Sequence, residues 1–151
     1  MIIKTGNLFN KPFPNKVVLI ATTNAVIRGQ TLVMGAGAAK DMVTFNHDAP
    51  RLAYEAIVQK SGTTDLPVYG YLRILDSDVG LGIFQTKKNY SAKSEIDLIK
   101  ISCEDLIEDA LNNHQVEFRL NYPGIGLGGL SKQDVSKYVE KLPDNVIVFE
   151  K

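Results

Sequence analysis

The chain has 151 residues, which is enough for one domain with a sizeable core, and we treat residues 1–151 as that domain. Lysine plus arginine and aspartate plus glutamate each number 17, so the formal net charge is zero and argues against broad electrostatic capture of nucleic acid. The single cysteine, Cys103, excludes an internal disulfide and a cysteine zinc cluster.

Strands and helices alternate along the first half of the chain. A short continuous β-branched run predicts a buried strand, Asp48 and Pro50 are helix-start signals, and residues 76–78 predict a turn. In chain order we expect a short edge strand at residues 2–4, a strand at roughly 16–21, a helix at roughly 37–45, a helix that ends near 61–62, and a hairpin of 68–75 and 81–85.

The second half continues the alternation. Ser94 is expected to cap a long helix, and Ser131 with Asp134 resembles a capping box that opens another, before Pro143. Strands are expected at 116–120 and 146–149. The buried stripe of the long helix is expected to hold Ile96, Ile99, Cys103, Ile107, Ala110 and Leu111. The whole pattern predicts an α/β fold, with a mixed central sheet between two helix layers in a three-layer α/β/α sandwich.

Two glycine-rich segments each follow a predicted strand. The first spans residues 34–39, after a loop that carries Asn24, and the second spans residues 123–130. Bare backbone N–H groups in such loops form anion-binding nests, so two of them at strand ends predict a cleft for a phosphate-bearing ligand. Lys40 stands where the dinucleotide fingerprint needs a small residue, and no Walker A motif is present.

Lys87 is the candidate reactive side chain. A lysine pair in a loop is ordinarily solvated, but Lys87 and Lys88 follow a buried strand and precede a helix, where active sites of α/β folds collect. The two histidines, His47 and His114, lie in predicted loops, and no serine has a nucleophile-elbow context. No group of histidines and carboxylates has metal-ligand spacing, so we expect no metal.

The order of these segments resembles the macro domain, an ADP-ribose-binding module. It is most similar to the branch that contains ADP-ribose-1''-phosphate phosphatases, ADP-ribosyl glycohydrolases and the antitoxin that removes ADP-ribose from DNA. The resemblance covers nearly the whole chain. The segments that carry it are Thr-Gly-Asn-Leu-Phe at 5–9, Ala-Thr-Thr-Asn at 21–24, Met-Gly-Ala-Gly-Ala-Ala at 34–39, Phe-Gln-Thr-Lys at 84–87, and Pro-Gly-Ile-Gly-Leu-Gly-Gly-Leu at 123–130.

The resemblance implies a role for each segment. Asn7 would meet the adenine, the glycine loops would hold the diphosphate, Asn24 would hold the distal ribose, and Lys87 would act at that ribose. Catalytic roles are thus expected for Lys87 and Asn24. Ligand binding is expected for Asn7, Leu8, Asn24, Met34, Gly35, Ala36, Gly37, Ala38, Thr86, Pro123, Gly124, Ile125, Gly126, Leu127, Gly128 and Gly129.

Two departures from the family pattern bear on activity. Asn7 replaces the usual aspartate, and an amide oxygen accepts a hydrogen bond without carrying charge. The second glycine loop is about two residues shorter than in close relatives, and it lacks the aspartate that assists the lysine in some glycohydrolases.

The resemblance implies a protein that binds ADP-ribose and hydrolyses a substituent at the distal ribose, as a phosphatase, glycohydrolase or deacylase. A non-catalytic ADP-ribose reader and an unrelated nucleotide-binding α/β protein are the alternatives. We expect no cofactor, a partner that is ADP-ribose or an ADP-ribosylated protein or nucleic acid, and a monomer. No signal-peptide pattern or bilayer-length apolar run occurs, so we expect a cytoplasmic protein without membrane contact.

Overall fold

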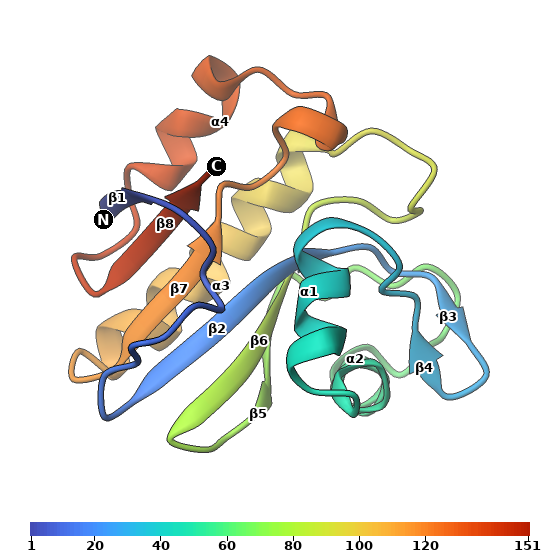
Figure 1. Ribbon diagram of the computed structural model, residues 1–151. Helices are drawn as coiled ribbons and strands as arrows, with labels where there is room; N and C mark the ends of the chain where they lie inside the picture. Colours follow the sequence, from blue (N-terminus) through green and yellow to red (C-terminus); the bar gives the residue numbers. More distant parts are fainter.

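One six-stranded mixed sheet forms the centre of the molecule (Figure 1). The computed structural model describes all residues, 1–151. Neighbouring strands pair in parallel except β5, which is antiparallel to β6. Across the sheet the strands are β1 (Ile2–Thr5), β8 (Val146–Glu150), β7 (Glu117–Asn121), β2 (Val17–Thr23), β6 (Val79–Gln85) and β5 (Tyr71–Leu75).

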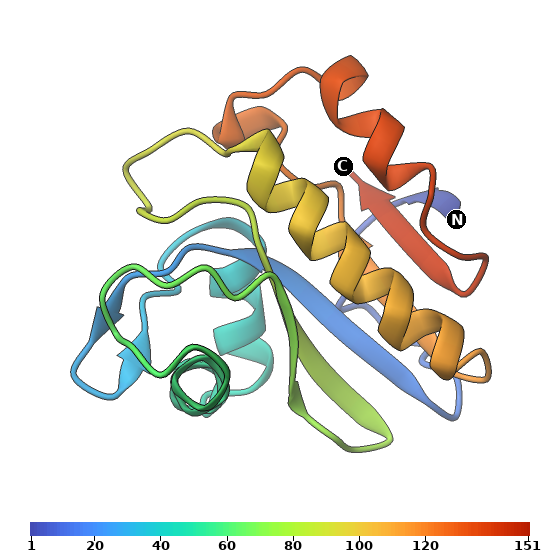
Figure 2. The same ribbon diagram turned by 180° about the vertical axis from the view of Figure 1, so that it is seen from behind.

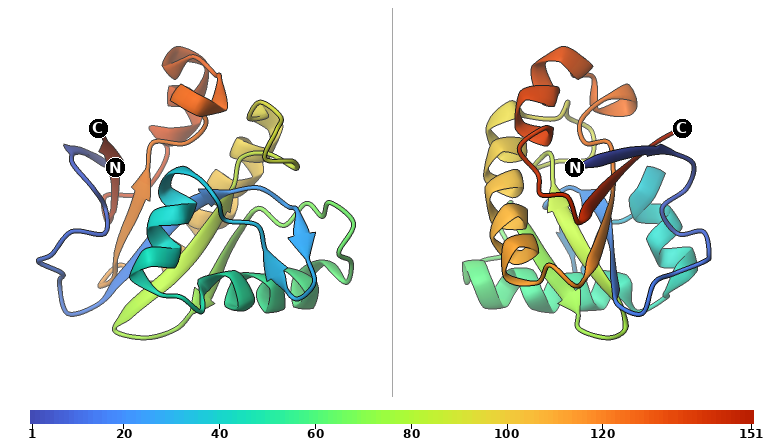
Figure 3. Two further views of the ribbon diagram at one scale, coloured as in Figure 1. Left: turned by 45° about the vertical axis from the view of Figure 1, so that its right-hand side comes forward. Right: turned by 90° about the vertical axis from the view of Figure 1, so that its left-hand side faces the viewer.

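Two helices cover each face of the sheet (Figures 2 and 3). The helices α1 (Gly37–Phe45) and α2 (Ala49–Ser61) pack on one face, and α3 (Ile96–Asn112) and α4 (Lys132–Val139) pack on the other. None of these helices combines the length and hydropathy that a bilayer crossing requires.

The side chains of β2 show why helices must pack on both faces of the sheet. Val17 and Leu19 belong to the core under α1 and α2, while Val18 and Ile20 belong to the core under α3 and α4. Successive side chains of a strand point to opposite faces, so an unbroken apolar run is stable only when both faces are buried. The three-layer α/β/α arrangement predicted from the sequence is therefore confirmed.

Two local expectations about this part of the chain are wrong. Ser94 does not cap α3, because the helix begins at Ile96 with Glu95 in the N-cap position and no side-chain cap. Leu111 is 59% exposed, and Leu106 is buried instead. The buried stripe follows the i, i+3, i+4 spacing through Ile99, Cys103, Leu106 and Ala110, so Leu111 falls one position beyond it.

Two small elements were not foreseen. A hairpin of β3 (Ile27–Arg28) and β4 (Thr31–Leu32) interrupts the segment between β2 and α1, and a short 3-10 turn, η1 (Gly126–Gly128), lies within the second glycine loop. Strands of two residues show no measurable alternation of polarity, so the sequence pattern could not indicate them.

The sheet parts at the carboxyl end of β2. Pairing between β2 and β7 stops at Ile20 and Leu120, whereas pairing between β2 and β6 continues to Thr23 and Gln85. Because β1, β8, β7, β2 and β6 are parallel, their carboxyl ends share one edge. Ligands of α/β proteins bind outside that edge, where neighbouring strands part.

The buried ionisable groups of the core predict a loss of stability in alkali. Burial raises the pKa of the Cys103 thiol from 9.0 to about 12. Burial also raises the pKa of Tyr69, and burial followed by the nearby Asp109 carboxylate raises that of Tyr71. The unfolded chain therefore releases these protons at a lower pH than the folded chain does.

The expected result is an unfolding free energy that is insensitive to these groups below about pH 8 and falls as the pH rises beyond 9, by up to about 1.4 kcal/mol per pH unit for each group. Urea unfolding at pH 8, 9, 10 and 11 measures it. The Cys103→Ala variant should lose less stability than the wild type between pH 9 and 10, and an equal loss would contradict this assignment of the thiol.

Candidate functional site

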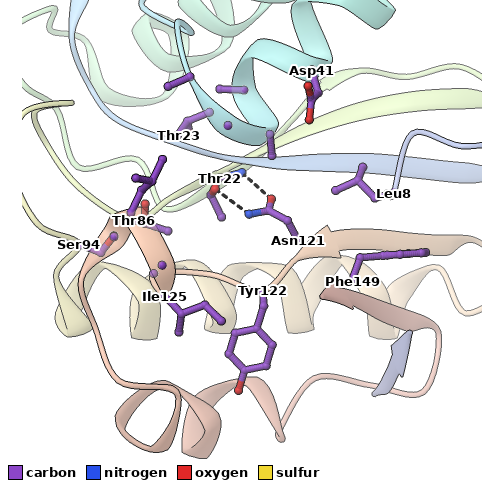
Figure 4. Close-up of a pocket in the computed structure, with 18 of the residues that line it drawn as sticks. Leu8, Thr22, Thr23, Asp41, Thr86, Ser94, Asn121, Tyr122, Ile125 and Phe149 are labelled. Atoms are coloured by element: carbon purple, nitrogen blue, oxygen red, sulfur yellow. Dashed lines mark hydrogen bonds between the residues drawn. The ribbon is translucent and has the colours of Figure 1, made fainter. Parts of the chain in front are cut away.

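A cleft of about 1040 Å³ opens along the carboxyl edge of the parallel strands (Figure 4). The segments that follow β1, β2, β6, β7 and β8 all contribute to its lining. Its floor lies where β2 and β7 part. There the Asn121 side chain bridges the strands, because its Nδ2 donates to Thr22 Oγ1 at 2.9 Å and its Oδ1 accepts from Thr22 N at 3.1 Å.

Asn24 and Lys87 lie opposite each other on neighbouring chain segments. Thr86 N donates to Thr23 O at 3.0 Å, and Ala25 N donates to Lys88 O at 2.9 Å, so the backbone at Asn24 lies beside the segment that carries Lys87. Both residues line the cleft, and Lys87 is half-buried while Lys88 is exposed and lies outside the lining. The two residues predicted to be catalytic are thus neighbours in space.

The backbone and side chain of Asn24 are held from several sides. Its Oδ1 accepts from Val26 N at 2.8 Å, its Nδ2 donates to Val33 O at 3.0 Å, and its carbonyl accepts from the buried Tyr69 hydroxyl at 2.5 Å. These bonds leave one amide hydrogen and one lone pair of Oδ1 for a ligand. A side chain fixed in this way loses little conformational entropy when it binds.

The first glycine loop supplies an open helix N-terminus. Gly35, Ala36 and Gly37 are exposed in the cleft, and α1 begins at Gly37 without a side-chain cap or an acidic residue in its first turn. The first N–H groups of a helix have no partner inside the helix, and the helix dipole places partial positive charge there. This end of α1 is suited to a phosphate group.

The second glycine loop forms the opposite wall. Gly124, Ile125, Gly126, Leu127 and Gly128 line the cleft. Three N–H groups, those of residues 128, 129 and 130, bond back into the turn, whereas those of residues 125 to 127 have no partner in that turn. The loop can therefore offer several backbone donors to a ligand held against the N-terminus of α1.

The segment after β1 closes the far end of the cleft. Leu8 is buried, and Phe9 and Phe149 line the cleft beside it. Asn7 Oδ1 accepts from Phe9 N at 2.9 Å, so the side chain shapes this turn while its Nδ2 stays available. An apolar surface edged by one amide suits a planar base.

Three of the residues predicted to bind ligand do not line the cleft. Met34 is buried in the core beneath α1, and Pro123 and Gly129 flank the lining part of the second glycine loop. All the other residues predicted to bind ligand, Thr86 and Ala38 among them, line the cleft.

Sequence reasoning missed several lining residues. Arg28 and Tyr90 meet at the cleft, where Arg28 Nη2 donates to Tyr90 Oη at 2.6 Å and the guanidinium lies 5.5 Å from the ring centroid. Asp41 of α1 and Ser94 also line it, as does Asn121. Asn121 could have been found as a polar residue at a strand end. Arg28 gave no signal, because its hairpin was not recognised.

Only some of the cationic side chains that line the cleft form ion pairs. Lys132 forms an ion pair with Glu150, but neither Arg28 nor Lys87 takes part in any of the ion pairs of the chain. Two cations without a carboxylate partner therefore lie on the segments around Asn24. Such a site favours a ligand that carries negative charge or develops it.

No family model matches the chain, and no curated protein matches it with significance. Among solved structures, the macrodomain of Mycobacterium tuberculosis DarG is similar, with a TM-score of 0.69, 23% identity, and coverage of 99% of this chain and 98% of that one. The macrodomain of Thermus aquaticus DarG gives a TM-score of 0.68 and 22% identity, over 99% and 97% of the two chains.

A third solved structure is that of Thermosipho africanus DarTG in complex with ADP-ribose, with a TM-score of 0.61 and 21% identity. The match covers 87% of this chain and 37% of that one. The protein is thus an α/β sandwich with a ligand-sized cleft at the carboxyl ends of its parallel strands. More particularly, the chain has the macrodomain fold.

Proposed function

We propose that the protein binds ADP-ribose in this cleft and hydrolyses a substituent at the distal ribose, as a phosphatase, glycohydrolase or deacylase. The observation that carries the proposal is the pair of backbone donor loops that face each other across the cleft, with Asn24 and Lys87 beyond them. The similar DarTG structure in complex with ADP-ribose supports the choice of ligand.

The proposed orientation follows from the chemistry along the cleft. The adenine would lie on the apolar end at Leu8 and Phe149, beside Asn7. The diphosphate would accept hydrogen bonds from the first turn of α1 and from the second glycine loop. The distal ribose would then reach Asn24, and its anomeric carbon would face Lys87.

In the glycohydrolase reaction, the bond between the anomeric carbon and its substituent breaks. A water molecule adds its hydroxyl group to the carbon, and its proton ends on the departing group. Negative charge develops on that group as the bond breaks, and the unpaired cations of Lys87 and Arg28 lie where they can stabilise it. We assign this electrostatic role to Lys87, because the residue lines the cleft and no carboxylate forms an ion pair that would offset its charge.

The reaction class is tested by incubating the protein with ADP-ribose-1''-phosphate, O-acetyl-ADP-ribose, ADP-ribosylated protein and ADP-ribosylated DNA. Turnover of at least one substrate is expected. The alternative, a non-catalytic reader, is favoured by the absence of the aspartate that assists the lysine in some related glycohydrolases. A reader would bind the same ligands and turn over none of them.

ADP-ribose should bind in one-to-one stoichiometry and at least about tenfold more tightly than AMP, because AMP lacks the second phosphate and the distal ribose. Isothermal titration calorimetry measures both affinities. Equal affinities for the two ligands would contradict the proposed orientation and would favour an unrelated nucleotide site.

A further inference from the structure

Ser94 carries a buried hydroxyl that nothing in the chain satisfies. The residue is 6% exposed, and its Oγ is the one buried side-chain nitrogen or oxygen atom in the protein without a hydrogen-bond partner. An unsatisfied buried hydroxyl costs about 1 to 3 kcal/mol, so native proteins rarely keep one without a reason.

Helix capping does not explain this serine. The α3 helix begins two residues later, at Ile96, and has no side-chain cap. The backbone of Ser94 is instead tied to the second glycine loop, because Ser94 N donates to Gly128 O at 2.8 Å. The next residue, Glu95, donates its N–H to Thr86 O at 2.8 Å. Ser94 therefore joins the two segments that carry Thr86 and Gly128 at the wall of the cleft.

The hydroxyl is directed at the glycine loop. A Cβ placed on Gly128 would lie 2.5 Å from Ser94 Oγ, and one placed on Gly124 would lie 3.5 Å from Ser94 Cβ. Ser94, Gly124 and Gly128 all line the cleft, where Ser94 lies next to Thr86 (Figure 4). The Ser94 hydroxyl is thus packed beneath the glycine loop that we expect to hold the diphosphate.

We propose that the Ser94 hydroxyl is a binding residue that donates a hydrogen bond to a phosphate oxygen held by the second glycine loop. This inference rests on the proposed function and adds a side-chain donor to a cradle otherwise made of backbone N–H groups. The backbone of Gly128 lies directly against the hydroxyl, so a phosphate oxygen reaches the hydroxyl only where the glycine loop shifts on binding. Because the Ser94 hydroxyl has no hydrogen-bond partner in the protein, it breaks no internal hydrogen bond when it donates to a phosphate oxygen.

The test compares Ser94→Ala with Ser102→Ala, a matched buried serine. Ser102 lies on α3, outside the cleft, and its Oγ donates to Gln85 O at 2.8 Å. Ser94→Ala should weaken ADP-ribose binding by at least about tenfold and raise the urea midpoint, because it removes an unsatisfied group. Ser102→Ala should lower the midpoint, because it leaves a carbonyl unpaired, and should keep the affinity.

Two further arms separate phosphate contact from packing. Ser94→Cys keeps the side-chain shape, with a somewhat larger terminal atom, and replaces a strong donor with a weak one, so its affinity should fall as that of the alanine variant does. Adenosine carries no phosphate, and its weak binding, followed by NMR titration, should be the same in wild type and Ser94→Ala.

The outcomes separate the inference from the function on which it rests. Wild-type affinity for ADP-ribose in Ser94→Ala, an equal loss for adenosine, or a lowered urea midpoint would overturn the role of Ser94 alone. A wild-type protein that binds no ADP-ribose would overturn the proposed function, and the role of Ser94 with it.

Discussion

Replacement of Lys87 by alanine is expected to lower turnover at least about a hundredfold while ADP-ribose affinity changes by less than about tenfold. A group that stabilises charge only as the bond breaks contributes to the transition state and little to ground-state binding. Lys87 is half-buried opposite Asn24, on the cleft wall, and forms no ion pair that would divert its charge. Single-turnover kinetics on the best substrate, together with calorimetry, measure the two effects separately.

Lys88→Ala is the matched control for this change. Lys88 is the next residue in the chain, is exposed, and does not line the cleft, although its carbonyl accepts the N–H of Ala25. The control removes the same formal charge and keeps the backbone contact, so turnover should stay within about twofold. A Lys87→Ala protein with full turnover would exclude the lysine from catalysis and would leave Asn24 and the loops as the acting groups.

Lys87→Arg separates charge from the chemistry of an amine. Arginine keeps the positive charge but neither gives up its proton nor attacks a carbon at neutral pH. Partial turnover in Lys87→Arg is therefore expected if the role is electrostatic. Loss equal to that in Lys87→Ala, with ADP-ribose affinity retained, would instead indicate that the amine itself reacts.

The larger elements could be predicted because their signals are local. The run at 17–21 is apolar without interruption, which predicts a buried strand. The helix at Gly37–Phe45 has its apolar residues on one face, which predicts an amphipathic helix. The glycine loops could be found for a similar reason, since glycine clusters after strands need no knowledge of distant residues. The macrodomain fold itself was predicted from the resemblance of these segments to a known family, and the similar solved structures share that fold.

The contacts that shape the cleft could not be predicted, because they join distant segments. Arg28 and Tyr90 are 62 residues apart, and Thr22 and Asn121 are 99 residues apart. Ser94 shows how tertiary structure overrides a local rule. A serine two residues before a helix is a plausible cap, yet the bond from its N–H to Gly128 O places its hydroxyl under the glycine loop instead.

Gly35→Glu is expected to reduce ADP-ribose affinity by more than about a hundredfold, which is roughly 3 kcal/mol, without unfolding the protein. Gly35 is exposed in the cleft beside the open N-terminus of α1, and a Cβ there meets nothing within 4 Å. Its backbone is not in the left-handed region that favours glycine. A glutamate would therefore extend into the proposed diphosphate site and place a carboxylate against the phosphates.

The other glycines of the two loops would give a less clear result. Gly37 has a φ of +58°, so a side chain there strains the backbone, and a Cβ on Gly128 would clash with Ser94 Oγ at 2.5 Å. Gly35→Gln has nearly the shape of Gly35→Glu without its charge, and Gly35→Ala adds only a methyl group. We expect affinity to fall from alanine to glutamine to glutamate, with equal thermal unfolding midpoints. Unchanged calorimetric affinity in a folded Gly35→Glu protein would place the phosphates elsewhere in the cleft.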